Sequence, residues 1–97
     1  MRFEWDEEKN RRNRLKHGIS FGDAAAVFFD VFSYTVEDSV VDDEERLLTV
    51  GMLVDLTITI VVHVTKDEYG EEIIRIISAR KASPLHRSRY QANARAR

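Results

Sequence analysis

The stretch DLTITIVVHVTKDEYGEEIIRIISARK, residues 55–81, decides the fold. Its first part alternates between two sides of an extended chain: Leu56, Ile58, Ile60, Val62 and Val64 on one, and Thr57, Thr59, Val61 and His63 on the other. This period of two predicts a strand over 55–65 with one buried face and one partly open face. A turn over 67–70, whose glycine suits a hairpin, leads into a second strand over 71–81.

Two helices are predicted ahead of this hairpin. Asp6 is a good N-cap and Gly18 stands where a helix ends, so the first helix covers about residues 6–17. It has almost no apolar face, so burial in the core alone cannot hold it. A second helix starts at Ser20 and runs to about Asp30. Its apolar stripe consists of Phe21, Ala24, Ala25 and Phe28.

The remaining elements follow from shorter patterns. A strand is predicted over 32–36, an acidic loop over 37–45 and a strand over 46–52. A last helix, with a serine N-cap and a proline in its first turn, runs over 84–90 and frays in ANARAR, residues 92–97. The order predicts an α+β domain: two N-terminal helices packed on an antiparallel sheet of three to four strands, plus a C-terminal helix.

Length and composition indicate one domain spanning residues 1–97, because 97 residues with 43% hydrophobic content suffice for one small core. The chain has no cysteine and no apolar run close to the roughly 20 residues that span a bilayer. It also has no basic-then-apolar leader at Met1. We therefore expect a soluble cytoplasmic protein without disulfide or thiolate chemistry.

Charge is strongly segregated along the chain. Residues 1–17 carry six Lys/Arg and four Asp/Glu, residues 18–72 carry two and thirteen, and residues 73–97 carry seven and none. Two basic ends that fold onto one face would form the footprint of a phosphate-binding protein. If the ends never meet, each is a solvated charged segment, and charge alone does not separate these alternatives.

Common catalytic signatures are absent from the sequence. It contains no HExxH, no P-loop, no GxGxxG and no GxSxG, and the acids at 42–45 match no calcium or magnesium spacing. We expect no metal site and no cofactor. What remains is a set of cations, histidines and one tyrosine: His17, Arg46, His63, Arg75, Arg80, His86, Arg87, Arg89 and Tyr90.

These side chains suit RNA cleavage without a metal. That reaction needs a base for the 2′-OH proton, cations for the charge on the phosphorane and an acid for the 5′-oxygen. Each residue alone has a structural explanation, since a strand histidine is more often a hydrogen-bonding partner and a strand arginine an ion-pair partner. The same cations would also bind nucleic acid or an acidic partner without any turnover.

Several segments together resemble the BrnT family of bacterial type II toxins. They are FEWD at 3–6, K...N..KHGISF at 9–21, ER at 45–46, Gly51, VVH at 61–63, IRIISAR at 74–80, Ala82 and Tyr90. The resemblance extends from Phe3 to Tyr90 in the same order. It implies a RelE-like fold and an endoribonuclease that inhibits translation. It also implies neutralisation by a BrnA-like antitoxin with a ribbon-helix-helix DNA-binding domain, and a toxin homodimer within a 2:2 complex that represses its operon by binding operator DNA through the antitoxin.

Site residues follow from this resemblance. It implies Arg46 and Arg80 as phosphate stabilisers, with Lys16 as an alternative cation. It also implies His17 or His63 as the proton-transfer group, and Tyr90 as the acid or a substrate-orienting group. We expect RNA contacts from Lys9, Asn13, Lys16, Arg75, His86 and Arg87. On a helical projection, Lys9, Asn13, Lys16 and His17 form one stripe, while Glu8, Arg11, Arg12 and Leu15 lie on the far side.

One position departs from the family pattern. Many members have Glu in a pattern like ER..Y near the C-terminus, where this chain has His86 in HRSRY. If that Glu were an essential base, this protein would be impaired or would use His86 instead. If it only pairs with an arginine, His86 is a tolerated change. The departure favours an alternative function, a catalytically weakened toxin homologue that acts mainly as an antitoxin-binding and co-repressor module.

Overall fold

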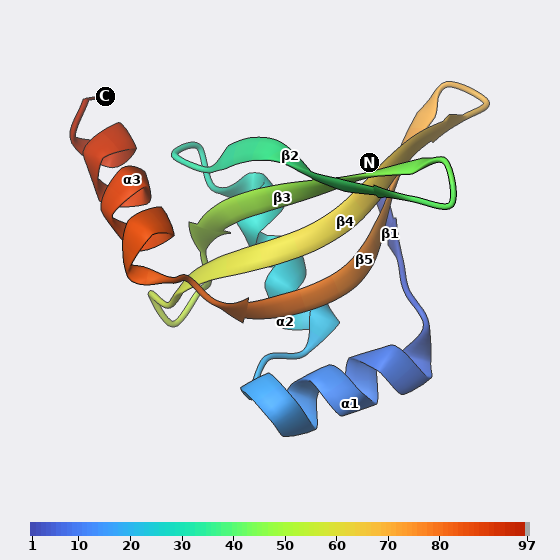
Figure 1. The fold of residues 1–97 in the computed structure, drawn as a ribbon, viewed down its shortest axis with the longest axis horizontal. Coiled ribbons are helices and arrows are strands. Elements are labelled where there is room, and N and C mark those ends of the chain that lie inside the picture. Colours follow the sequence, from blue (N-terminus) through green and yellow to red (C-terminus); the bar gives the residue numbers. More distant parts are fainter. Residues whose placement is uncertain (97) are drawn as a thin grey trace.

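A five-stranded mixed sheet forms the centre of the molecule in a computed structural model that describes residues 1–96 (Figure 1). Its strand order is β1-β5-β4-β3-β2, and every neighbouring pair is antiparallel except β1 and β5, which are parallel. The elements in chain order are β1 (Arg2–Glu4), α1 (Glu7–His17), α2 (Phe21–Ala24), the 3-10 helix η1 (Ala25–Phe29), β2 (Tyr34–Val41), β3 (Glu44–Met52), β4 (Ile58–Glu68), β5 (Glu71–Lys81) and α3 (Pro84–Arg95).

The predicted fold class is wrong in its arrangement. The chain begins with strand β1 rather than with a helix, and the sheet has five strands and is mixed. A three-residue strand is too short to show alternation, and its parallel partner β5 lies at the other end of the chain. A RelE-like arrangement of two N-terminal helices on a sheet of three to four antiparallel strands therefore does not describe this molecule.

Two local predictions also need correction. The second helix is only four residues long and continues as the 3-10 helix η1, which lies close against β3. A Cβ on Gly51 of β3 would lie 2.7 Å from the Cβ of Val27, so glycine permits this approach. The expected acidic loop is mostly strand, because β2 continues to Val41 and a turn at Asp42 and Asp43 leads into β3.

Other boundaries are confirmed. The Asp6 carboxylate accepts a hydrogen bond from the Lys9 amide at 3.1 Å, and Gly18 ends α1 with φ of 74°. The hairpin of β4 and β5 forms around Gly70, where φ is 82°. Helix α3 starts at Pro84 as predicted but runs on to Arg95 instead of fraying after Tyr90. Of the expected frayed tail, Arg97 lies outside the described residues.

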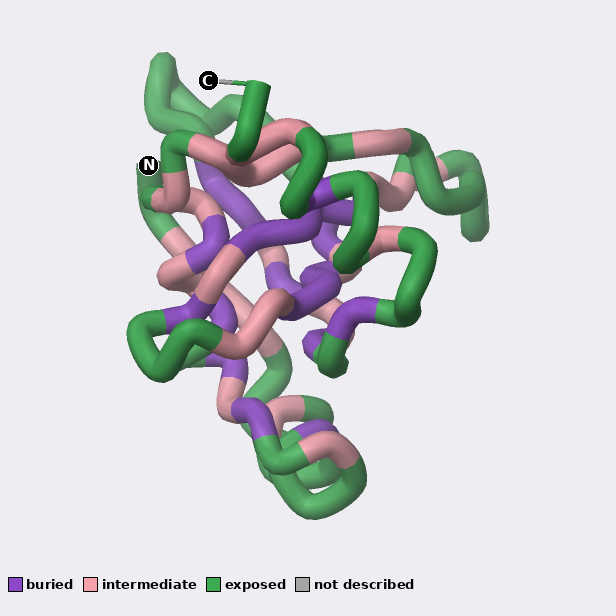
Figure 2. The backbone as a smooth tube through the Cα atoms, turned by 90° about the vertical axis from the view of Figure 1, so that its left-hand side faces the viewer, coloured by how far each residue is buried: buried purple, intermediate pink, exposed green. Residues whose placement is uncertain are grey.

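The two faces of the sheet differ in what lies on them. We call the side packed against α2 and η1 the covered face. Its buried residues include Thr49, Val61, His63, Ile76 and Ala79. We call the opposite side the open face; there α3 packs on a cluster formed by Leu48, Val50, Ile60, Ala82 and Tyr90. Figure 1 shows α2 behind the sheet and α3 across one end of it, and Figure 2 shows buried backbone concentrated in the middle of the molecule.

Within residues 1–96, no helix is long and apolar enough to cross a membrane.

Candidate functional site

Three arginines share the open face beyond α3. Arg46 lies on the same side of β3 as buried Leu48 and Val50, because side chains two positions apart on a strand point the same way. On β5, Arg80 stands opposite Ile60, and Arg75 stands opposite Val64. Because paired residues of adjacent strands point to the same side, all three guanidinium groups lie on the face that α3 leaves uncovered.

The three arginines differ in their partners. Arg75 forms an ion pair with Glu44, also on the open face. Arg80 is exposed and forms no ion pair with any residue from 1 to 96. The Nε of Arg46 is buried and has no hydrogen-bond partner in the described chain. A buried guanidinium N–H without an acceptor is costly, so this atom favours an anion such as a phosphate.

Helix α1 adds a second group of cations at the β5 edge. A hollow of about 240 Å³ lies between the helix and the strand. Its lining residues are Lys9, Arg12, Asn13, Lys16, His17, Ile77 and Ser78. Ser78 pairs with Val62 and so belongs to the open face, which makes the hollow continuous with it. Arg12 was predicted on the far side of α1 but lines the hollow. Its spacing of three from Lys9 was the signal for a shared surface.

Asn13 has an internal role in this group. Its side-chain amide donates to the carbonyls of Ile19 at 2.9 Å and Ala79 at 2.8 Å, and its oxygen accepts from the Ala79 amide at 3.1 Å. The side chain thus replaces a strand partner on the part of β5 that β1 does not reach. Because Asn13 is buried and satisfied, it positions α1, while Lys9, Lys16 and His17 remain beside the hollow.

His63 lies on the covered face, away from the arginines. Its ring is buried, its Nε2 lies 2.8 Å from the Thr49 hydroxyl, and its ring centre is 4.8 Å from that of Phe28. Burial lowers the pKa of His63 from 6.5 to about 4, so the ring is neutral at pH 7. The structure therefore does not bring His63 into one cleft with Arg46, Arg80 and His17.

Tyr90, on the buried side of α3, is also inaccessible to solvent. Its hydroxyl donates to Asp30 at 2.5 Å, and the same carboxylate accepts from the amides of Met52 and Phe32 at 2.8 and 2.9 Å. Burial, together with the Asp30 carboxylate, raises the pKa of Tyr90 to about 12. This network ties α3 to the segment before β2 and to the end of β3.

His86 and Arg87 lie on different sides of α3. The His86 Nδ1 is 2.8 Å from the Tyr34 hydroxyl, and the guanidinium of Arg89 stacks 4.5 Å from the centre of the Tyr34 ring. Arg87 lines a separate hollow beside the β3–β4 turn, with Leu56, Thr57, Ile58 and Lys81. The contacts of Tyr34 and Arg89 carried no specific signal in the sequence.

Among residues 1–96, no group of three or more His, Asp or Glu side chains is placed to hold a metal ion. The arrangement instead offers cations around an open sheet face, with a half-buried histidine, His17, in the hollow at its edge. Such a surface can bind a phosphodiester and place a proton-transfer group beside it.

Comparisons with known proteins identify the family of the chain. No curated protein matches the chain. The chain is similar to the crystal structure of the ribonuclease toxin BrnT from Brucella abortus, with 31% sequence identity and a TM-score of 0.60; the match covers 86% of this chain and 97% of that chain. A family model described as the ribonuclease toxin BrnT of type II toxin–antitoxin systems matches residues 5–85. The chain therefore belongs to the BrnT family of ribonuclease toxins of type II toxin–antitoxin systems.

Proposed function

We propose that the open face binds RNA and that the chain cleaves it without a metal ion. The observation that carries this proposal is the placement of Arg46, Arg75 and Arg80 on one uncovered face, continuous with the hollow that contains His17. Arg46 supports it further, because its buried Nε lacks a partner among residues 1–96. Family membership supports the ribonuclease activity, and the cations of the open face support its location there.

In this mechanism the 2′-oxygen attacks the phosphorus as its proton moves to a base. The P–O5′ bond then breaks, and the 5′-oxygen takes a proton from an acid. Arg46 and Arg80 stabilise the extra charge on the phosphorane, with Lys16 as a further cation. We assign the proton transfer to His17, since His63 is buried on the covered face and Tyr90 donates to Asp30. Lys9 and Arg12 contact the flanking phosphates.

The test uses purified protein and RNA in the presence of EDTA. The wild type cuts, and Arg46→Ala or Arg80→Ala lowers the rate by about 100-fold, the loss typical for one group that stabilises the transition state. Arg11→Ala is the matched control, because Arg11 is exposed and pairs with Glu8 outside the hollow. Cleavage that stops in EDTA would contradict the metal-independent mechanism. Unchanged cleavage by both arginine variants would contradict the assignment of the RNA site to the open face.

We also propose the partners and physiology of the family. A type II toxin implies a cognate antitoxin; we infer a BrnA-like ribbon-helix-helix protein that neutralises this chain. A 2:2 complex would contact operator DNA through the antitoxin, and cleavage of mRNA in the cytoplasm would inhibit translation. Sequencing the adjacent gene tests the first point, and the mass of the co-purified complex tests the second.

A second candidate function is a weakened homologue that mainly binds antitoxin and acts in repression. His86 favours it, because this residue stands in place of the family Glu and its Nδ1 faces the Tyr34 hydroxyl. Expression of the chain alone separates the two functions. Arrested growth supports the ribonuclease, whereas harmless expression of folded protein that still binds antitoxin supports the binding module.

A further inference from the structure

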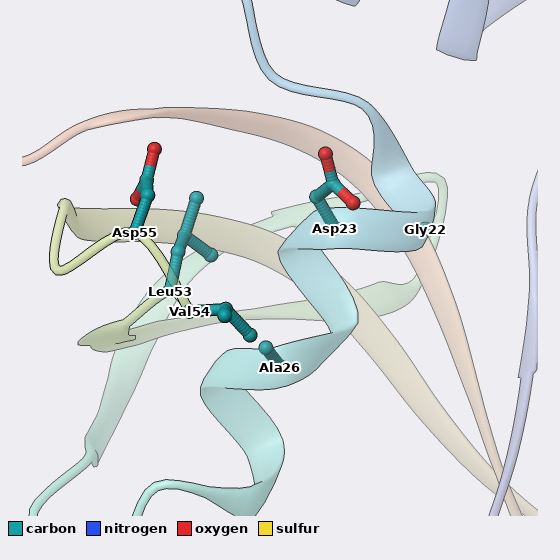
Figure 3. Close-up of a pocket in the computed structure, with 6 residues that line it drawn as sticks. All are labelled: Gly22, Asp23, Ala26, Leu53, Val54 and Asp55. Carbon is teal, nitrogen blue, oxygen red and sulfur yellow. The ribbon is translucent and has the colours of Figure 1, made fainter.

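A second cavity lies outside the RNA face, between the start of α2 and the β3–β4 turn at 53–57. Its volume is about 320 Å³, and Figure 3 shows the side chains around it. The lining residues are Gly22, Asp23, Ala26, Leu53, Val54 and Asp55. None of the arginines of the open face lines it. The cavity therefore requires its own explanation.

The lining combines an apolar wall with two carboxylates. Ala26, Leu53 and Val54 provide the apolar wall. The carboxylates of Asp23 and Asp55 point to the same side of the cavity (Figure 3). No residue from 1 to 96 forms an ion pair with the Asp23 carboxylate. Such a lining fits a cation on an aliphatic stem and repels phosphate.

The second carboxylate, Asp55, is stabilised in its charged form. Asp55 accepts a hydrogen bond from the Thr57 amide at 3.0 Å. Hydrogen bonding from Thr57 holds the pKa of Asp55 below its usual value. Asp55 is therefore negative throughout the neutral range, and its position is fixed by the turn.

The turn itself exposes apolar side chains in a strained conformation. Val54 is 92% exposed and Leu56 is 73% exposed. Leu56 has φ of 72°, a left-handed value that a leucine rarely adopts. Bonds from the Leu53 amide to the Thr57 carbonyl and from the Leu56 amide to the Leu53 carbonyl, both 2.9 Å, hold it there. A partner that covered Val54 and Leu56 would remove this apolar area from water.

We propose that this cavity is a socket for an arginine or lysine side chain of the cognate antitoxin. The aliphatic stem lies against Ala26, Leu53 and Val54, and the cationic head lies between Asp23 and Asp55. Apolar residues beside that cation contact Val54 and Leu56. The proposal rests on the antitoxin partnership that the family brings and is independent of RNA cleavage, because the socket lies outside the open face.

A small-molecule titration tests the chemistry of the socket directly. Nα-acetyl-arginine amide is added to ¹⁵N-labelled protein at millimolar concentrations, with the neutral isostere Nα-acetyl-citrulline amide as the matched control. The arginine compound should shift the amide signals of Gly22, Val54 and Asp55, and the citrulline compound should not. Equal shifts with both compounds, or none with either, would overturn the socket.

An affinity measurement tests the partner. We expect Asp23→Asn/Asp55→Asn to weaken antitoxin binding at least tenfold, and Ala26→Leu, which fills the cavity without changing charge, to weaken it as well. Asp42→Asn/Asp43→Asn is the matched control: it removes two charges from a turn whose positive φ values of 51° and 60° asparagine adopts readily. An unchanged dissociation constant for both socket variants would overturn the proposal. All these variants should cut RNA as the wild type does, so a failed socket and a failed ribonuclease are distinguishable.

Discussion

The two faces of the sheet hold candidate site residues in opposite states. On the covered face, His63 is buried, neutral at pH 7 and close to Thr49 and Phe28. On the open face, Arg46, Arg75 and Arg80 surround an uncovered surface. Residues 62 and 63 are neighbours in the chain but project to opposite faces, because side chains alternate along a strand.

This difference shows that a residue's type within a family motif does not define its role. His17 and His63 both belong to matching segments, yet only His17 lies beside cations at the open face. Lys16 and Asn13 are three positions apart on one helix, and one is exposed while the other is buried in hydrogen bonds with β5. Burial and hydrogen-bond partners therefore distinguish the residues available for catalysis from those that stabilise the fold.

The largest expected effect compares the two histidines. His17→Ala should lower RNA cleavage by about 100- to 1000-fold, because the reaction loses its proton-transfer group. His63→Gln should keep the cleavage rate within about threefold of wild type when it is measured below the melting temperature of the variant. Glutamine can still form a hydrogen bond with Thr49, and position 63 lies on the covered face. Rates of single-turnover cleavage measure both effects. The reverse ranking would place the catalytic histidine on the covered face.

The next effect concerns the link between α1 and the sheet. Asn13→Ala removes three buried hydrogen bonds and should lower the free energy of unfolding by about 3 kcal/mol. Urea denaturation measures this loss. Lys16→Ala is the control on the same helix, because Lys16 is exposed, and should change stability by less than about 0.5 kcal/mol. Equal losses in the two variants would show that Asn13 does not hold the helix.

The smallest effect is the response of the covered face to acid. The pKa of His63 is about 4 in the folded chain and 6.5 in its ordinary state, so between these values the unfolded chain binds more protons. The contribution of His63 is fully present above pH 6.5 and is lost as pH falls toward 4, by roughly 2–3 kcal/mol. His63→Gln should flatten the stability profile between pH 6.5 and 4. Parallel profiles for wild type and variant would refute a buried neutral histidine.

Local signals predicted the caps of α1 and the hairpin of β4 and β5. Asp6, Gly18 and Gly70 each act through their immediate neighbours, so the sequence shows them directly. The five-stranded order escaped prediction because β1 is only three residues long and pairs with a distant strand. The end of β2 was not predicted, because Val40 and Val41 are exposed on an edge strand and show no alternation.

The candidate site was predicted in part for the same physical reason. Alternation along one strand puts Arg75 and Arg80 on opposite faces of the sheet. A bulge between Val62 and His63, where the pairing of β4 with β5 shifts, changes the side on which later β5 residues stand. Only the register of β3, β4 and β5 together places the three arginines on one side.

The pairing of the first strand with the last has a consequence for how the chain is made. Residues 66 positions apart meet when Asn13 bonds Ala79, and β1 joins the sheet only beside β5. Such non-local contacts form late and slowly. During synthesis, therefore, the growing chain lacks the partner strand of β1 and two of its three open-face arginines, Arg75 and Arg80, until β5 has been made. The proposed RNA-binding surface is therefore completed only after β5 has been made.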